Sequence, residues 1–144
     1  MKVLFGCDPN ATEMKKTLMQ VAEKMGCDVV DMGSDDPIYG NTAITVAEAV
    51  AAGTGDRGVL VCGTGLGMSI AANKVKRVCR ASDRCVFRAA RRAQQQREYR
   101  LHGRVYDRRK AGGGAAQTFL SLSFDPNSSS APKVACYRAY DQSR

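Results

Sequence analysis

The 144-residue sequence lacks several features that would assign a protein to a class at once. It has no apolar run of the roughly 18 residues that a transmembrane helix needs, and the apolar start before Cys7 is too short for a signal peptide. Its six cysteines show no CxxC spacing, which argues against a metal site or a disulfide framework. These absences predict a cytoplasmic protein with reduced thiols, no metal and no membrane partner.

Acidic residues are scarce in one part of the chain only. Residues 77–110 hold eleven arginines and one lysine against three acidic residues, a net charge of +9, whereas the whole chain carries +8. A basic block is typical of nucleic-acid binding, but its few aromatic residues are sparse for base stacking. The remainder is nearly neutral, so we expect no nucleic-acid partner. A Rossmann-like nucleic-acid-binding protein that uses this block stays an alternative.

Apolar runs alternate with amphipathic stretches over the first half of the chain. The expected strands are 2–8, 27–34 and 58–64, and the expected helices are 10–26, 42–53 and 66–74. This alternation predicts parallel βαβ units and hence an α/β fold, a Rossmann-like three-layer α/β/α arrangement with a parallel, nominally five-stranded sheet. Such sheets bind ligands at the carboxyl ends of their strands, where Asp8 and Cys62 both lie.

The pattern breaks down after residue 76. Residues 77–114 show no clean alternation and offer no good candidate for the later strands, whereas 115–124 read as the apolar side of a closing helix. We expect a single domain over 1–124 that contains this anomalous basic block. Residues 125–144 read as a polar linker and a C-terminal tail.

The stretch "CGTGLGMSIAANKV", residues 62–75, carries the chemistry. A thiol at a strand end beside a helix N-terminus is surrounded by unpaired backbone N–H groups, which favour the thiolate. The glycines allow close approach of a ligand, and their N–H groups can hold an anionic oxygen. Cys62 is therefore a candidate nucleophile or base. The alternative is a buried, inert cysteine followed by a tight turn.

Two familiar loops are excluded by Met68. A GxGxxG dinucleotide fingerprint needs glycine at this position, and a cysteine phosphatase loop needs arginine there. A phosphocysteine subunit of a sugar phosphotransferase system stays an alternative. Its loop follows the first strand, however, whereas here the loop follows the third.

Residues 1–76 resemble type B ribose-5-phosphate isomerase and its sibling, galactose-6-phosphate isomerase. Besides 62–75, the similarity includes "GCD" at 6–8, "DVVDMGS" at 28–34 and "VAEAVAAG" at 46–53. The resemblance implies a cytoplasmic homodimer with shared active sites that interconverts an aldose phosphate and a ketose phosphate. It implies neither a metal nor an organic cofactor. Ribose 5-phosphate and ribulose 5-phosphate are the expected pair, which assigns the protein to the pentose phosphate pathway.

The resemblance also implies roles for individual residues. Cys62 would be the base that moves a proton between C1 and C2 of the open-chain sugar, and Thr64 would add a hydroxyl contact. The positions implied to bind substrate are Asp8, Gly63, Gly65, Leu66, Gly67, Ser69 and Asn73. Ser69 and Asn73 could equally cap or pack the helix. Tyr39 stands near the loop tyrosine of the family, but out of step with it.

Two departures from the family stand out. Pro9 replaces the histidine that usually follows the aspartate, and residues 77–114 lack the family's Asp-x-Tyr-x-Ala helix start and its His-Asn pair. The ring-opening histidine belongs to that pair, and His102, the lone histidine, is not at its position. The written sequence is therefore expected to have low or absent isomerase activity.

A shift of reading frame accounts for the second departure. With mostly G/C-ending codons, residues 78–107 read one nucleotide later permit an Asp-x-Tyr-Ser-Ala segment, a His-Asn pair, an apolar strand and a glycine pair, in the family's order. We hypothesise that 77–114 is a frame-shifted translation of the family segment, with the original frame restored before "QTFLSLSF".

Overall fold

The computed structural model describes residues 1–33, 35–63, 65–76, 86–90, 100–101, 104–105, 111–121, 125, 127, 129 and 131–143. In chain order the elements are β1 (Lys2–Cys7), the 3-10 turn η1 (Pro9–Ala11), α1 (Thr12–Lys24), β2 (Asp28–Asp31), α2 (Tyr39–Ala52), β3 (Arg57–Cys62), α3 (Leu66–Ala72), β4 (Val86–Ala90), β5 (Arg100–Leu101), β6 (Arg104–Val105), α4 (Ala111–Ser121) and α5 (Ala131–Gln142).

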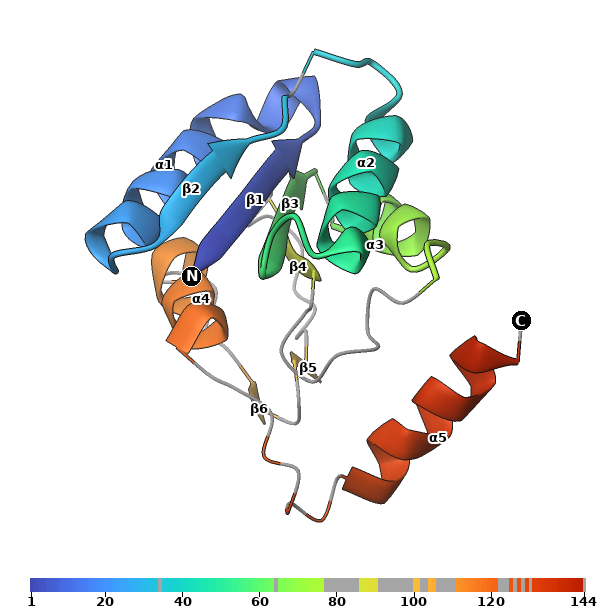
Figure 1. The fold of residues 1–144 in the computed structure, drawn as a ribbon. Helices are drawn as coiled ribbons and strands as arrows, with labels where there is room; N and C mark the ends of the chain where they lie inside the picture. Colours follow the sequence, from blue (N-terminus) through green and yellow to red (C-terminus); the bar gives the residue numbers. More distant parts are fainter. Residues whose placement is uncertain are drawn as a thin grey trace.

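Four parallel strands of the described residues form one sheet in the order β2-β1-β3-β4 (Figure 1). Strands β5 and β6 form a separate antiparallel pair. The sheet with helices on both faces confirms the predicted Rossmann-like α/β class. Strand β4 differs from expectation, because it lies inside the basic block, where the sequence offered no good strand.

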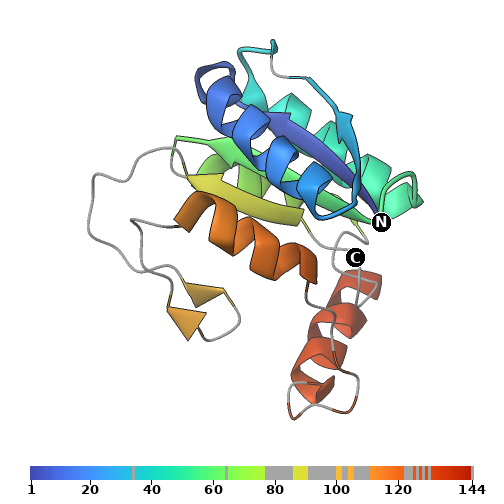
Figure 2. The same cartoon turned by 90° about the vertical axis from the view of Figure 1, so that its left-hand side faces the viewer.

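Helices cover both faces of the sheet (Figures 1 and 2). On one face, α1 and α4 bury Leu18, Ala22 and Leu120 against apolar side chains of β1 and β3. On the other face, α2 and α3 bury a second cluster that includes Val46 and Met68. Because β1 and β3 are the middle strands, both faces of each are covered, and their side chains are almost all buried.

Helix α2 begins at Tyr39, three residues before the start that apolar periodicity predicts. The carboxylate of Asp36 accounts for the earlier start. Its Oδ1 accepts a hydrogen bond from the Ile38 amide at 2.7 Å, and its Oδ2 accepts one from Asn41 Nδ2 at 2.9 Å. These bonds stabilise the first turn by occupying donors there.

Three side chains differ from the expected inward faces of the helices. Met25 and Ile44, which helical spacing directs inward, are at the surface. Lys15, which apolar spacing does not place on the inward face, is buried on α1. Amphipathic spacing predicts which face of a helix is covered, but not where that face ends or which charged residue finds a partner beneath it.

The C-terminal helices occupy different places. Helix α4, which was expected at 115–124, packs on the sheet, and Arg57 at the start of β3 donates a hydrogen bond to the carbonyl of Phe119 in α4. The Arg57 guanidinium also lies 5.0 Å from the centre of the Phe119 ring. Helix α5 stands apart from the sheet (Figure 1). Within the described part of the chain, each helix is too short or too polar to cross a bilayer.

Candidate active site

The carboxyl ends of β1 and β3 bring Asp8 and Cys62 to the same edge of the sheet. Cys7 pairs with Val61 in the parallel ladder, and the Asp8 amide donates a hydrogen bond to the Val61 carbonyl at 2.9 Å. Asp8 and Cys62 are the next residues along each strand, so they are neighbours across the ladder. The structure thus brings together the two side chains on which the sequence analysis depends.

The Cys62 thiol is buried rather than exposed to solvent. Its side chain is 4% exposed and packs in the cluster beneath α2 and α3. Its Sγ accepts a hydrogen bond from the Gly65 amide at 3.1 Å. A backbone N–H that points at sulfur stabilises negative charge there.

At two positions of the loop, the geometry explains why the residue is glycine. Gly65 has φ +76°, in the left-handed region, and directly precedes α3. Gly67 lies under the ring of Tyr39, since an added Cβ would be 2.8 Å from both Cε2 and Cζ of that ring. Tyr39 therefore lies over the first turn of α3, and α2 and α3 meet at this point.

The Asp8 carboxylate already has local partners. Its Oδ1 accepts hydrogen bonds from the Asn10 amide at 2.8 Å and from Asn10 Nδ2 at 3.1 Å. This is the turn-capping arrangement of an acidic residue at a strand end. Among the described residues no donor reaches Oδ2 of Asp8, so this oxygen stays available to a ligand hydroxyl.

The remaining predicted positions differ in what surrounds them. Gly63 is exposed, with open space where a Cβ would lie, and the Leu66 side chain is 48% exposed. Asn73 Nδ2 donates to the Ser69 carbonyl at 2.7 Å, which closes the C-terminus of α3. That contact is the helix-capping role that the sequence left open for Asn73. Thr64 lies outside the described residues.

The arrangement has the parts that proton transfer at a carbon requires. The Cys62 sulfur accepts a hydrogen bond from a backbone amide, Gly63 is exposed beside it, and a carboxylate oxygen of Asp8 lies at the same edge. Together these groups could hold a polyhydroxy substrate and move one of its protons. Across the part of the chain that the structure describes, no group of three or more His, Cys, Asp or Glu side chains is placed to hold a metal ion.

Sequence reasoning gave Tyr39 too little weight. Its contact with Gly67 joins α2 to the glycine-rich loop, and the signal for it in the sequence was the family's loop tyrosine, with which Tyr39 is out of step. The pair of buried Lys15 and half-exposed Asp31 was missed entirely. An aspartate at the end of a strand and a lysine within a helix are too common to attract notice without the fold.

Comparisons with known proteins identify the family of the chain. The family model described as Ribose/Galactose Isomerase matches residues 3–135. The D-erythrulose-4-phosphate isomerase 2 of Mycolicibacterium smegmatis is 34% identical over 148 aligned positions, which cover 98% of this chain and 97% of that protein. Ribose-5-phosphate isomerase B of Escherichia coli is 43% identical over 76 residues, 51% of each chain.

The fold comparison extends the match to nearly the whole chain. The structure of ribose-5-phosphate isomerase B from Clostridium thermocellum superposes with a TM-score of 0.75 and 26% identity, covering 99% of both chains. The family match also runs through the basic block, beyond the 1–76 on which the sequence resemblance rested. The chain therefore belongs to the ribose/galactose isomerase family, and its enzyme class is that of a sugar-phosphate isomerase.

Proposed function

We propose that this enzyme interconverts ribose 5-phosphate and ribulose 5-phosphate by proton transfer through an enediolate. The observation that carries the proposal is the placement of Cys62 beside Asp8, with the Gly65 amide bonded to the sulfur. The names of the Escherichia coli and Clostridium thermocellum relatives support ribose 5-phosphate as the substrate.

In the proposed reaction the Cys62 thiolate removes the proton from C2 of the open-chain aldose. The electron pair of the broken C–H bond forms the C1–C2 double bond, and the aldehyde oxygen becomes anionic. Backbone amides of residues 63–67 stabilise this oxygen, and the Thr64 hydroxyl adds a contact. Cys62 then returns the proton to C1, while the proton of the C2 hydroxyl moves to the oxygen on C1. The result is the ketose.

Asp8 and the residues after Cys62 hold the substrate in this proposal. The free Oδ2 of Asp8 accepts a hydrogen bond from a sugar hydroxyl, and Leu66, Ser69 and Asn73 line the approach along α3. Exposure supports this assignment for Leu66 and Asn73. Asn73 is the weakest member, because its amide is engaged by the Ser69 carbonyl.

A coupled assay tests the proposal. The protein made from the natural gene should convert ribose 5-phosphate to ribulose 5-phosphate, and Cys62→Ala in that protein should lower kcat by about 10²–10⁴-fold, the range for loss of a general base. Cys136→Ala is the matched control, because Cys136 is exposed on α5 and should tolerate the change. Equal turnover by Cys62→Ala and the wild type would refute the role of the thiol.

A four-carbon sugar phosphate is the second candidate substrate. The relative that supports it is named for D-erythrulose 4-phosphate and aligns with 98% of this chain, whereas the Escherichia coli relative aligns with half. The same chemistry serves both substrates, since each needs a proton moved between neighbouring carbons. Comparing kcat/KM for the two substrates decides between them.

We also propose that the enzyme is a cytoplasmic homodimer. Apolar side chains at the surface near the loop support a partner subunit there: Ile38, Leu66 and Ile70 are 65%, 48% and 62% exposed. Among the described residues, Cys27, Cys62 and Cys136 carry thiols that form no disulfide, which supports a reducing compartment. Light scattering of the purified protein, together with Ile70→Glu, tests the dimer. A wild-type monomer would refute it.

A further inference from the structure

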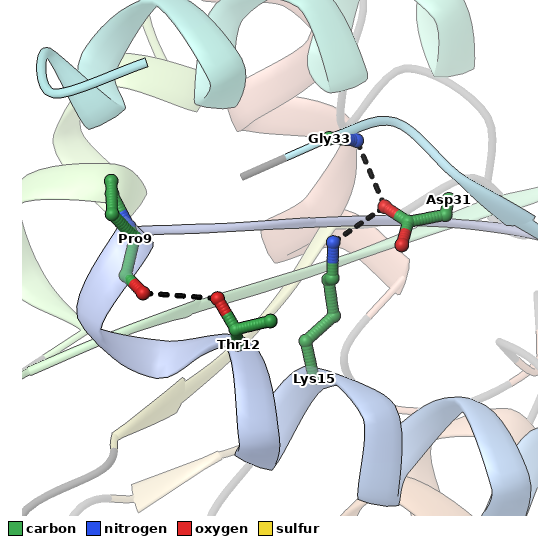
Figure 3. A network of polar contacts seen from close by, with 5 residues as sticks. All are labelled: Pro9, Thr12, Lys15, Asp31 and Gly33. Atoms are coloured by element: carbon green, nitrogen blue, oxygen red, sulfur yellow. Dashed lines mark hydrogen bonds and ion pairs between the residues drawn. The ribbon is translucent and has the colours of Figure 1, made fainter. Parts of the chain in front are cut away.

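Among the described residues, the buried ammonium group of Lys15 has one polar partner, the carboxylate of Asp31. Lys15 lies on α1 with its side chain 2% exposed, and its Nζ is 2.5 Å from Asp31 Oδ1 (Figure 3). A lysine is rarely buried to this extent unless it is paired. Asp31 itself is 45% exposed, so the pair lies at the end of β2, at the boundary between core and solvent.

The same oxygen of Asp31 holds the chain beyond β2. Oδ1 also accepts a hydrogen bond from the Gly33 amide at 2.8 Å (Figure 3). Gly33 has φ +98°, a conformation that favours glycine, and its carbonyl accepts a hydrogen bond from the Cys7 amide at 3.4 Å. Asp31 is thereby linked through Gly33 to the last residue of β1.

These contacts enclose the turn that carries Asp8. The turn begins after Cys7, whose amide donates a hydrogen bond to the Gly33 carbonyl. It continues through η1 into α1, the helix that contains Lys15. The Thr12 hydroxyl donates to the Pro9 carbonyl at 2.9 Å and holds η1 to α1 (Figure 3). One carboxylate oxygen therefore ties together the two ends of the Asp8 turn.

The charge state of Asp31 suits this task. Burial favours the neutral form of this carboxyl, but the hydrogen bond from Lys15, the Gly33 amide and the lysine charge together outweigh it and hold the pKa of Asp31 below its ordinary value. The carboxylate is therefore an ionised acceptor under ordinary conditions.

We propose that Lys15 and Asp31 are positioning residues that fix the Asp8 turn against the end of β3, next to Cys62. The proposal rests on the proposed function, in which Asp8 binds a sugar hydroxyl. Neither residue touches substrate; each acts through the turn. Loss of the tie lets the Asp8 carboxylate shift relative to Cys62, which weakens substrate binding more than it slows the proton transfer.

A double-mutant cycle with Asp8 tests this role. Lys15→Met should lower kcat/KM by about tenfold, mainly through KM, because a small displacement of a binding group is costly. In an Asp8→Asn background, Lys15→Met should lower it less than about twofold, since the group being positioned is already lost. A merely structural lysine would give the same loss in both backgrounds, and that result would overturn the proposal.

The neighbouring lysine provides the matched control. Lys16 is 61% exposed on the same helix and pairs with Glu13 at 3.0 Å, so Lys16→Met should leave kcat and KM unchanged. If Lys15→Met fails to fold, the variant Lys15→Met with Asp31→Asn, which leaves no unpaired charge, carries the same expectations. A cycle without coupling in that variant would equally overturn the proposal.

A second readout does not depend on turnover. Lys15→Met should speed hydrogen exchange at the amides of Cys7, Asp8, Asn10 and Ala11 by about tenfold, because the tie that closes the turn is gone, and Lys16→Met should not. If the wild type isomerises no sugar phosphate, the proposed function fails, and faster exchange still supports the tie. Unchanged exchange in Lys15→Met overturns the positioning role whatever the activity.

Discussion

The Gly65 amide donates a hydrogen bond to the Sγ of Cys62 at 3.1 Å, across a turn of three residues. This contact joins the end of β3 to the first turn of α3, and it directs a donor at the atom that the proposed reaction uses. The thiol is otherwise surrounded by apolar side chains. Cys62 is therefore part of the core, and in the proposed reaction its sulfur is the general base.

The enclosure of Cys62 predicts slow alkylation. With iodoacetamide and the free enzyme, exposed Cys136 should react first, and Cys62, at 4% exposure, should react much more slowly. Saturating ribose 5-phosphate should slow modification of Cys62 further and leave Cys136 unaffected. Peptide mass spectrometry over time gives both rates. Modification of Cys62 that substrate does not slow would place the sugar elsewhere.

The contact between Tyr39 and Gly67 predicts a steric effect. Gly67→Ala should destabilise the protein by about 1–3 kcal/mol, because the new Cβ meets the tyrosine ring. Adding Tyr39→Ala should relieve this clash, although the packing of the ring itself is lost. Gly40→Ala is the control, since nothing lies within 4 Å of a Cβ there. Urea denaturation measures all four chains; equal stability of Gly67→Ala and the wild type would contradict the contact.

The pair of Lys15 and Asp31 predicts a dependence of stability on pH. Because the folded-state pKa of Asp31 lies below its ordinary value of 3.8, its contribution is full above that value and is lost as the pH falls through the lowered pKa. Asp31→Asn should therefore destabilise the protein near about pH 7 and do so progressively less near about pH 3. Denaturant unfolding of both proteins across this range checks the sign. A constant difference would show that the charge of Asp31 plays no part.

The reading-frame hypothesis predicts a mass. If residues 77–114 are a shifted translation, the protein made from the natural gene will differ in intact mass from this 144-residue sequence. A chain that does have the written sequence should show low or absent isomerase activity, since the family's ring-opening histidine is missing from it. Intact-mass spectrometry decides the first point. Full turnover by a chain of the written mass would contradict the second.

Residues 1–76 show how much of the fold periodicity alone can predict. The three strands and three helices expected there all occur, with ends within a few residues of those predicted. Strand β3 is the clearest case, because a continuous apolar run followed by glycine leaves few alternatives. The prediction errs where a polar side chain determines the residue at which a helix begins, as Asp36 does at the start of α2.

The second half was less predictable for a physical reason. Strand β4 pairs through backbone hydrogen bonds with β3, and a segment rich in arginine gives little sign of such pairing. The candidate site could be placed at Asp8 and Cys62 because both follow apolar strands. The tie through Lys15 could not, since it depends on which residue of α1 comes to lie over the end of β2.

The sheet order has a consequence for how such a gene can change. The three strands formed by residues 1–76 are adjacent, and β4 is added at the outer side of β3. A sequence change confined to the residues after 76 therefore alters β4, at one side of the sheet, and α4, which covers one face. The Asp8–Cys62 edge is formed by residues 1–76 and keeps its sequence.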